Sequence, residues 1–288
     1  MVRKALLAAL AAVCLVIPAV GQVAGDYLDV YMVNIKPEKQ ADFEALAAKM
    51  ADANRKHNGD RWLAVEGAYG DPSVAAFIST RDSYAEIDKA ENAFMAALHK
   101  AYGEATAKKM MGEWSNCVSS SRVELRRRRW DLSRKAPADA VAYAKLVGQA
   151  RVMRTTAVHV RPGRIADFEA MMKDVKEAAE KNDSTQTVLV SQVVEGGNGT
   201  VFYVTSLRPG LDGFDKNPTA RDILGEEGYK KYLQAVAETV ESANSMILRY
   251  SAEMSAPPDA IAAIASDFWN PKPPAAAKAK TKTETPKQ

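Results

Sequence analysis

Residues 33–44 read VNIKPEKQADFE, and residues 158–169 read VHVRPGRIADFE, 125 positions further along the chain. In each stretch an apolar, β-branched segment precedes a basic residue and a proline, and Ala-Asp-Phe-Glu follows. The β-branched segment predicts a strand, and the proline predicts the first turn of a helix. Because two such stretches at a fixed spacing are hard to obtain by chance, the sequence predicts an internal duplication.

The order of elements is expected to be the same in both copies. At a spacing of 122 residues, Gly103-Glu104 aligns with Gly225-Glu226 and Arg127 aligns with Arg249. Alternating and β-branched runs predict four strands per copy, at 28–35, 61–69, 74–80 and 123–130 and again at 152–160, 187–194, 200–206 and 246–252. Apolar residues at helical spacing predict a helix after the first strand of each copy and another before the last, over 104–120 in the first copy. The region just before residue 104 is expected to be short helical or irregular.

This order, βαββαβ, is that of a ferredoxin-like unit, whose sheet carries its helices on one face only. The uncovered face needs a partner, and a second unit in the same chain supplies one. We therefore expect an α+β fold in which two tandem βαββαβ ferredoxin-like units pack sheet to sheet as one pseudo-dimeric barrel. The expected division is a signal peptide over 1–25, a first ferredoxin-like repeat over 26–135, a linker helix over 136–150, a second ferredoxin-like repeat over 151–256, a closing helix over 257–270 and a disordered basic tail over 271–288.

Residues 1–25 have the pattern of a secretory signal. Arg3 and Lys4 precede an apolar run over 5–17, and cleavage after Gly21 or after Gly25 fits the small-residue rule. The run is short for a membrane span, so an uncleaved anchor is the lesser alternative. We expect an exported protein, periplasmic or extracellular, with no transmembrane segment in the mature chain.

The charge is concentrated at the two ends. The formal net charge of the chain is +3, of which Arg3 and Lys4 supply +2 and the segment 271–288 supplies +4, so the part between them carries −3. A slightly acidic folded part argues against nucleic-acid binding, which needs a basic face. The tail is either a plain solubilising segment or one that attracts an anionic envelope polymer through Lys272, Lys278, Lys280, Lys282 and Lys287.

Reactive clusters are scarce in this sequence. It has three histidines and two cysteines, one of which, Cys14, lies within the predicted signal. No pair of histidines or cysteines has the spacing of a zinc site, and no nucleophile motif is present. The sequence therefore predicts no metal, no cofactor and no catalytic residue.

Five residues are candidates for lining a ligand pocket. His159 lies between Val158 and Val160 on a predicted strand, so alternation sends it to the opposite face, into the space between the sheets, as for its repeat partner Asn34. The alternative is that both are satisfied polar residues without a ligand. The further candidates are the matched arginines Arg127 and Arg249, together with Tyr203. For the run Arg126–Arg129, the alternative to a ligand-binding role is an edge strand whose charges prevent aggregation.

The repeated V-x-I/V-K/R-P…A-D-F-E segments and the element order resemble the dimeric α/β barrel superfamily over roughly residues 26–268. That superfamily includes the NIPSNAP, antibiotic-biosynthesis monooxygenase, EthD-like and stress-responsive barrel families and the haem-binding chlorite dismutases. The resemblance implies the barrel fold but not one function, because one fold hosts many. A haem-binding version would need an axial ligand, and His159 is the residue that would have to supply it.

The expected function is non-catalytic binding of a small apolar or acidic ligand, or of a partner surface, by an exported tandem barrel. One alternative is a cofactor-independent, monooxygenase-like enzyme with a pocket in the barrel. The other is an envelope-associated protein held by its cationic tail.

Overall fold

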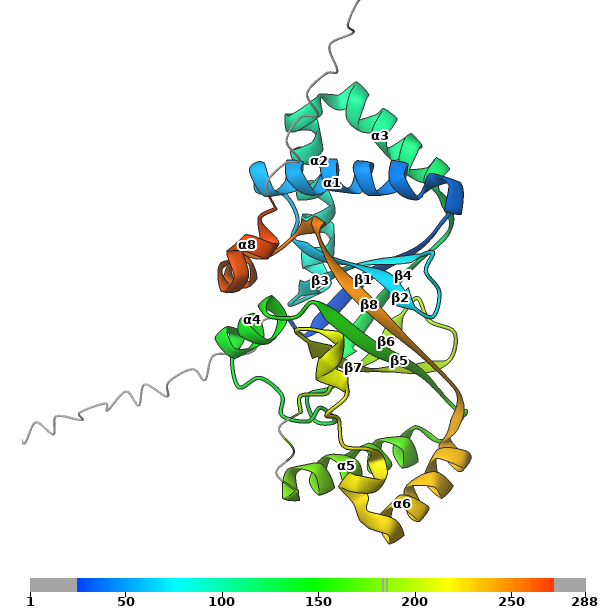
Figure 1. The fold of residues 1–288 in the computed structure, drawn as a ribbon. Coiled ribbons are helices and arrows are strands. Elements are labelled where there is room, and N and C mark those ends of the chain that lie inside the picture. Colours follow the sequence, from blue (N-terminus) through cyan, green and yellow to red (C-terminus); the bar gives the residue numbers. More distant parts are fainter. Residues whose placement is uncertain (1–24, 183, 185, 272–288) are drawn as a thin grey trace, which may run out of the picture.

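The computed structural model describes residues 25–182, 184 and 186–271 (Figure 1). The predicted signal and the predicted basic tail lie outside the described residues, apart from Gly25 and Pro271. No helix in the described ranges combines the length and the apolar character that crossing a membrane requires.

The first half of the chain begins with the first of the two repeated stretches. Pro37 starts a 3-10 turn that leads into α1, whose Phe43, Leu46 and Met50 are buried on one face. The elements in order are β1 (Tyr27–Ile35), η1 (Pro37–Lys39), α1 (Gln40–Lys56), β2 (Trp62–Tyr69), β3 (Val74–Arg81), α2 (Ala85–Tyr102), α3 (Glu104–Cys117) and β4 (Val118–Arg128).

The second half follows a connecting helix, α4 (Ala140–Gly148), which Asp139 caps by accepting a hydrogen bond from the Ala142 amide. The elements of this half are β5 (Val152–Val160), α5 (Ile165–Lys181), β6 (Leu189–Glu195), β7 (Thr200–Arg208), η2 (Leu211–Phe214), α6 (Ala220–Thr239) and β8 (Val240–Ala256). The short helices α7 (Asp259–Ala262), η3 (Ala263–Ala265) and α8 (Ser266–Trp269) end the described chain.

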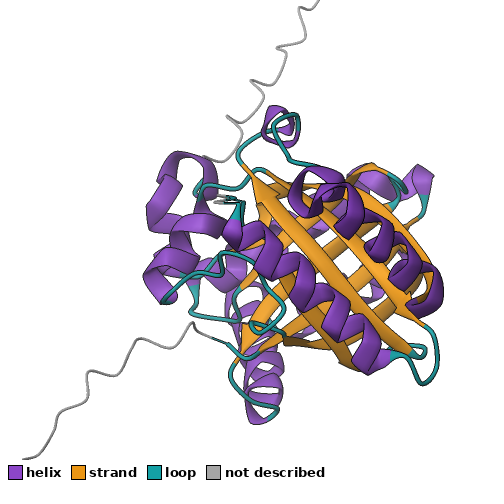
Figure 2. Cartoon of the chain, turned by 90° about the horizontal axis from the view of Figure 1, so that it is seen from below, coloured by secondary structure: helices purple, strands orange, loops and turns teal. Residues whose placement is uncertain are grey.

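The eight strands form one closed antiparallel barrel in the order β1-β3-β2-β8-β5-β7-β6-β4 (Figure 2). The halves therefore join edge to edge, through hydrogen bonds between β2 and β8 and between β4 and β6, rather than by stacking one sheet on the other. Closure pairs the backbone groups that two open sheets would leave at their edges. The arginine run of β4 is consequently not on an edge strand, because β4 pairs with β1 on one side and with β6 on the other.

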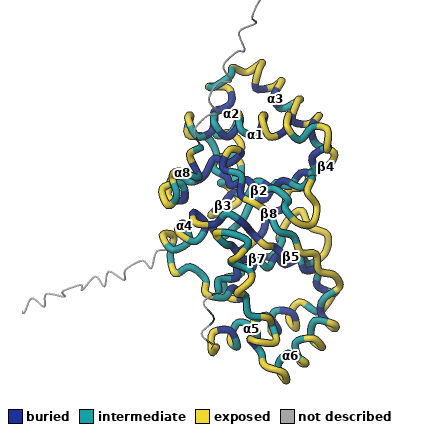
Figure 3. The backbone as a smooth tube through the Cα atoms, in the orientation of Figure 1, coloured by how far each residue is buried: buried dark blue, intermediate teal, exposed yellow. Residues whose placement is uncertain are grey.

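Helices cover the barrel at two opposite ends of the molecule, with α1, α2 and α3 over the first half and α5 and α6 over the second (Figures 1 and 3). The outward residues Val33 and Ile35 pack in one core with Phe43 and Trp114, whose ring centroids lie 4.5 Å apart. Val158 and Val160 occupy a second core with Phe168 and Phe202. A third core joins inward barrel residues to α4 and to the closing helices, with Trp269 fully buried. The added segments thus close one side of the barrel.

A glycine interrupts the helical layer at matching positions of the two halves. Gly103 separates α2 from α3 with φ +79° and ψ 158°, and Gly225 breaks α6 with φ +66° and ψ 174°. These angles favour glycine, because a side chain rarely adopts positive φ. The sequence match of Gly103-Glu104 with Gly225-Glu226 thus coincides with one backbone conformation in both halves.

Candidate functional site

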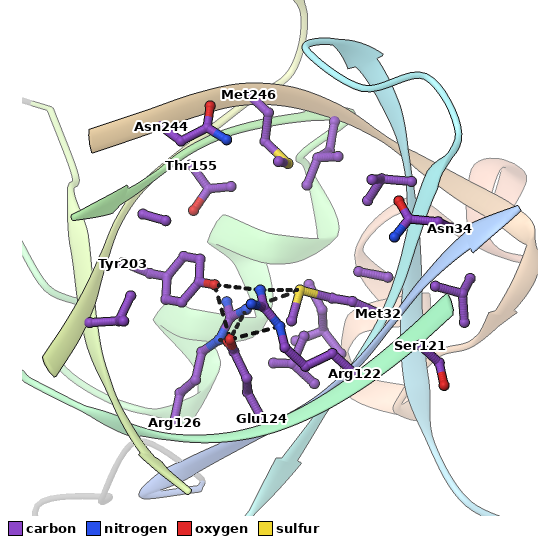
Figure 4. Close-up of a pocket in the computed structure, with 18 of the residues that line it drawn as sticks. Met32, Asn34, Ser121, Arg122, Glu124, Arg126, Thr155, Tyr203, Asn244 and Met246 are labelled. Carbon is purple, nitrogen blue, oxygen red and sulfur yellow. Dashed lines mark hydrogen bonds and ion pairs between the residues drawn. The ribbon is translucent and has the colours of Figure 1, made fainter. Parts of the chain in front are cut away.

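A cavity of about 480 Å³ lies inside the barrel, between strands of both halves (Figure 4). Strand alternation builds it, because every second side chain of a barrel strand points inward. On β5 the inward series is Met153, Thr155, Ala157 and His159, while Val158 points to the helices. Asn34, His159 and Tyr203, three of the five residues predicted from sequence, lie in the lining of this cavity.

A buried ion cluster occupies the wall formed by β4. Glu124 is 1% exposed. Its carboxylate accepts hydrogen bonds from Arg126 at 2.7–2.8 Å and pairs with Arg122 at 3.1 Å. The Tyr203 hydroxyl donates to the same carboxylate at 3.3 Å from β7 in the other half. The Arg126 guanidinium stacks over the Tyr203 ring, 3.4 Å from its centroid. The two halves of the chain therefore meet in this cluster.

Positive charge is in excess in the barrel interior. Arg128, the next inward residue on β4, is 7% exposed, and its guanidinium donates to the Tyr143 hydroxyl at 2.8 Å while its Nε has no partner in the described part of the chain. The described residues that line the interior include Arg122, Arg126 and Arg128 but one carboxylate only, that of Glu124. Burial lowers the pKa of Arg126 and raises that of Tyr203. Tyr203 is therefore a neutral phenol near neutral pH, whereas arginine keeps its charge in proteins.

Arg127 and Arg249 do not reach this cavity, contrary to the expectation from their repeat pairing. Both are exposed on the outer face of the barrel, and the inward neighbours are Arg126 and Leu248. The inward set could have been found from strand register, because Val30 is paired with Glu124 and Leu28 with Arg126 across β1 and β4, on the side that also carries Asn34. Element order without register does not supply that information.

A second cavity, of about 540 Å³, lies outside the barrel between the first sheet and α1, α2 and α3. Its lining is rich in aromatic residues, namely Tyr31, Trp62, Phe77, Phe94 and Trp114. Its arginine, Arg81, is neutralised, because it makes two bonds of 2.7 and 2.9 Å to the Asp60 carboxylate and lies 3.4 Å from Asp29. This cavity therefore offers an aromatic, largely apolar surface in which the arginine is paired with a carboxylate.

A third cavity, of about 300 Å³, lies between the second sheet and α5 and α6. Its lining is almost wholly aliphatic and aromatic, and Arg134 is its one charged residue. None of the three cavities resembles a metal centre, since no three histidine, cysteine or acidic side chains of the described residues are grouped to hold an ion.

Haem, which the barrel superfamily can carry, does not fit this arrangement. Haem iron needs an axial donor in an apolar slot. Neither apolar cavity under the helices includes histidine or cysteine in its lining, and burial raises the pKa of Tyr232, which disfavours a phenolate ligand. His159 lies instead in the barrel cavity, in a lining that also holds Asn34, Asn198 and Asn244.

The fold is similar to those of several solved structures. A candidate monooxygenase from Fusobacterium nucleatum subsp. nucleatum has a TM-score of 0.51 and 11% identity, covering 79% of this chain and 93% of that chain. A candidate monooxygenase from Lactobacillus acidophilus has a TM-score of 0.46 and 12% identity, over 78% and 93%. A mutant chlorite dismutase from Candidatus Nitrospira defluvii has a TM-score of 0.47 and 8% identity, over 83% and 95%.

At these identities the likeness shows the fold alone, that of the dimeric α+β barrel proteins. It assigns the chain to no family. The sequence matches no protein-family model, and its comparison with curated proteins gives no match either.

Proposed function

We propose that this chain binds a small organic anion inside the barrel, without catalysis. The observation that carries the proposal is the charge imbalance of the described interior, where Arg122 and Arg126 share the carboxylate of Glu124 and Arg128, further along β4, has no ion pair among the described residues. A buried charge without a partner costs several kcal/mol. An anionic ligand would balance the excess and gain about 4 kcal/mol of Coulomb energy per contact at 4 Å and an effective dielectric constant of 20.

The cavity also indicates what the rest of the ligand would be. Val30, Met32, Met153 and Leu248 give the interior apolar walls. Arg122 lies at the accessible end of the ion cluster, with its side chain 54% exposed, and can turn toward a ligand at little cost. A carboxylate with a short apolar body matches these features, since guanidinium groups bind carboxylates through paired hydrogen bonds.

The test compares neighbouring arginines of one strand. Titration calorimetry with a panel of short carboxylates would measure binding to the wild type, to Arg126→Gln and to Arg127→Gln. We expect Arg126→Gln to weaken binding at least tenfold, since a hydrogen bond to a charged group contributes about 1.5–3 kcal/mol. The exposed Arg127 is the matched control, and its variant should bind as the wild type does.

Arg122→Gln provides a second variant that leaves the buried pair of Glu124 and Arg126 in place. It should fold normally and still lose affinity. Equal affinity in all four proteins, or no binding of any carboxylate to the wild type, would refute the proposal.

The aromatic cavity favours a second candidate function, the enzyme-like alternative. Its size and its rings suit a planar apolar substrate, and the Tyr31 hydroxyl, 3.2 Å from Trp114 Nε1, is a polar group at its wall. The monooxygenase description belongs to the structural neighbours, and we transfer it to this chain as a hypothesis only. Oxygen consumption with planar phenols would test it, with Phe77→Ala as the variant that should reduce the rate. No oxygen uptake above the protein-free rate would reject this function.

We further propose that the two halves are copies of one unit, divided as the repeat predicts, and that the chain is exported. The shared strand order and the paired glycine breaks support the first point. Cell fractionation of the full chain and of a chain starting at Gln22 would test export. Deletion of 271–288 would test the tail, and unchanged envelope association would remove its role as an anchor.

A further inference from the structure

The third cavity has an unusual composition for its size. Its lining is apolar on the sheet, on α5 and on α6, with Val158, Phe168, Met171 and Val236 among its residues. It lies on the face of the second sheet opposite the barrel cavity, because Val158 points into it and the adjacent His159 points into the barrel. A ligand bound there would not meet the ion cluster around Glu124.

Arg134 is held at this cavity by its backbone. Its amide donates to the Val188 carbonyl at 2.9 Å, and the Val188 amide donates back at 3.1 Å, which fixes the residue beside β6. Nη1 of Arg134 is buried and has no hydrogen-bond partner among the described residues. Burial lowers the pKa of Arg134, and the neighbouring charge of Arg208 lowers it further. The described surroundings of this partly buried arginine thus contain no carboxylate that pairs with it.

The cavity of the first half also holds an arginine, but that arginine has carboxylate partners. There Arg81 is bound by the Asp60 carboxylate through two hydrogen bonds and has Asp29 nearby. No described residue makes an ion pair with Arg134. A buried donor without a partner is unfavourable, and the described part of the cavity of the second half lacks the carboxylate that the cavity of the first half contains.

We propose that this cavity binds an apolar monocarboxylic acid, with the carboxylate on Arg134 and the hydrocarbon chain along Val158, Phe168 and Met171. A non-hydrogen atom with its hydrogens is about the size of a water molecule, which occupies about 30 Å³. The cavity volume of about 300 Å³ therefore holds about ten such atoms. Octanoic acid has that size. Burial of its chain favours binding, and the arginine adds selectivity for the acid over uncharged analogues.

Octanoate and octan-1-ol, titrated calorimetrically into the full-length protein, test the inference. In the wild type we expect octanoate to bind at least tenfold more tightly than the alcohol. Arg134→Gln should remove that preference, whereas Arg161→Gln, which changes an exposed arginine of the same half, should keep it. Equal affinities for acid and alcohol in the wild type, no binding of octanoate, or a preference that survives in Arg134→Gln would overturn the proposal.

Two further variants distinguish binding in this cavity from binding in the barrel. Val236→Phe fills the cavity from α6 and leaves Arg134 unchanged, so it should weaken both ligands together. Arg126→Gln, in the barrel cavity, reports on any octanoate that binds there instead. Loss of octanoate binding in Arg126→Gln, with Val236→Phe unaffected, would assign the acid to the barrel and overturn this inference. Each variant is first checked for a wild-type far-UV circular dichroism spectrum.

Discussion

At the scale of single residues, the carboxylate of Glu124 is the charge that stabilises the arginines of the barrel interior. Glu124→Gln keeps the shape but removes the charge that Arg126 and Arg122 share. Breaking a buried ion pair on one side costs about 3–5 kcal/mol, so we expect the free energy of unfolding in urea to fall by that amount. Glu113, which is exposed and pairs with Lys109 on the surface, gives the control, and Glu113→Gln should change stability by less than about 0.5 kcal/mol.

The same variant links stability to the proposed function. With Glu124 neutral, an added carboxylate ligand becomes the one anion for the interior arginines. A saturating ligand should therefore stabilise Glu124→Gln more than the wild type in the same urea titration. An equal increase in the free energy of unfolding of both proteins would show that ligand binding does not depend on this cluster.

The carboxyl of Glu66 gives a prediction of how the stability of the protein depends on pH. Burial raises the pKa of this β2 carboxyl, and the nearby Glu44 raises it further. The folded protein therefore binds the Glu66 proton more tightly than the unfolded chain, so this residue lowers stability as pH rises through its folded pKa. Glu66→Gln should raise the free energy of unfolding at pH 7, and the gain should vanish below the unfolded glutamate pKa of about 4.3. Urea denaturation from pH 3.5 to 8 measures both, and a gain that is constant with pH would contradict the assignment.

At the scale of elements, the glycine break in the helical layer gives a matched pair of variants. A Cβ at Gly225 or at Gly112 meets no atom within 4 Å, so neither change causes a clash. Gly225 has φ +66° and ψ 174°, a region that costs a side chain about 1–3 kcal/mol. Gly112 lies inside α3, where alanine is about 1 kcal/mol more favourable than glycine. Thermal unfolding should show Gly225→Ala destabilised and Gly112→Ala stabilised, and two changes of the same sign would contradict this reading of α6.

The elements also show where sequence patterns were sufficient. The β-branched runs predicted β1 and β5 to within a residue at each end, because alternation and the following proline mark both limits. The region before residue 104, expected to be short helical or irregular, is a regular helix over Ala85–Tyr102, so its length was underestimated. Ala97 and Leu98 are its buried residues, and Phe94 and Met95 pack partly buried against the same core as α1.

The candidate site was predictable in part for a related reason. Alternation within one strand was enough to direct Asn34 and His159 inward, since each lies between outward-facing apolar residues. The inward arginine of β4 could be identified only by comparison with a second strand. Pairing of the repeats pointed to Arg127, whereas the register of β4 on β1 places Arg126 inward. No sequence pattern marked Arg134, because what distinguishes it is a spatial property, the lack of an ion-pair partner among the described residues.

At the scale of the whole molecule, the barrel cavity belongs to neither half alone. Glu124 comes from β4 and Tyr203 from β7, and hydrogen bonds between β4 and β6 hold the two halves in register. The core inside the barrel likewise contains Leu63 of the first half and Tyr250 of the second. Separation of the halves would expose that core and both strand edges, so we infer that the barrel is one folding unit.

This inference predicts a single unfolding transition that responds to either half. Phe43 and Phe168 occupy the repeated Ala-Asp-Phe-Glu segments and are buried at 0% and 1% exposure in separate helical cores. Each change to alanine should cost about 3–5 kcal/mol. For a protein of this size 1 kcal/mol lowers Tm by about 2–4 °C, so both variants should show one calorimetric peak shifted down by about 6–20 °C, with calorimetric and van't Hoff enthalpies equal. Halves that unfold independently would instead give two peaks in each variant, with Phe43→Ala moving one and Phe168→Ala moving the other. That result would make the closed barrel a contact between two domains rather than the common core on which the ligand site depends.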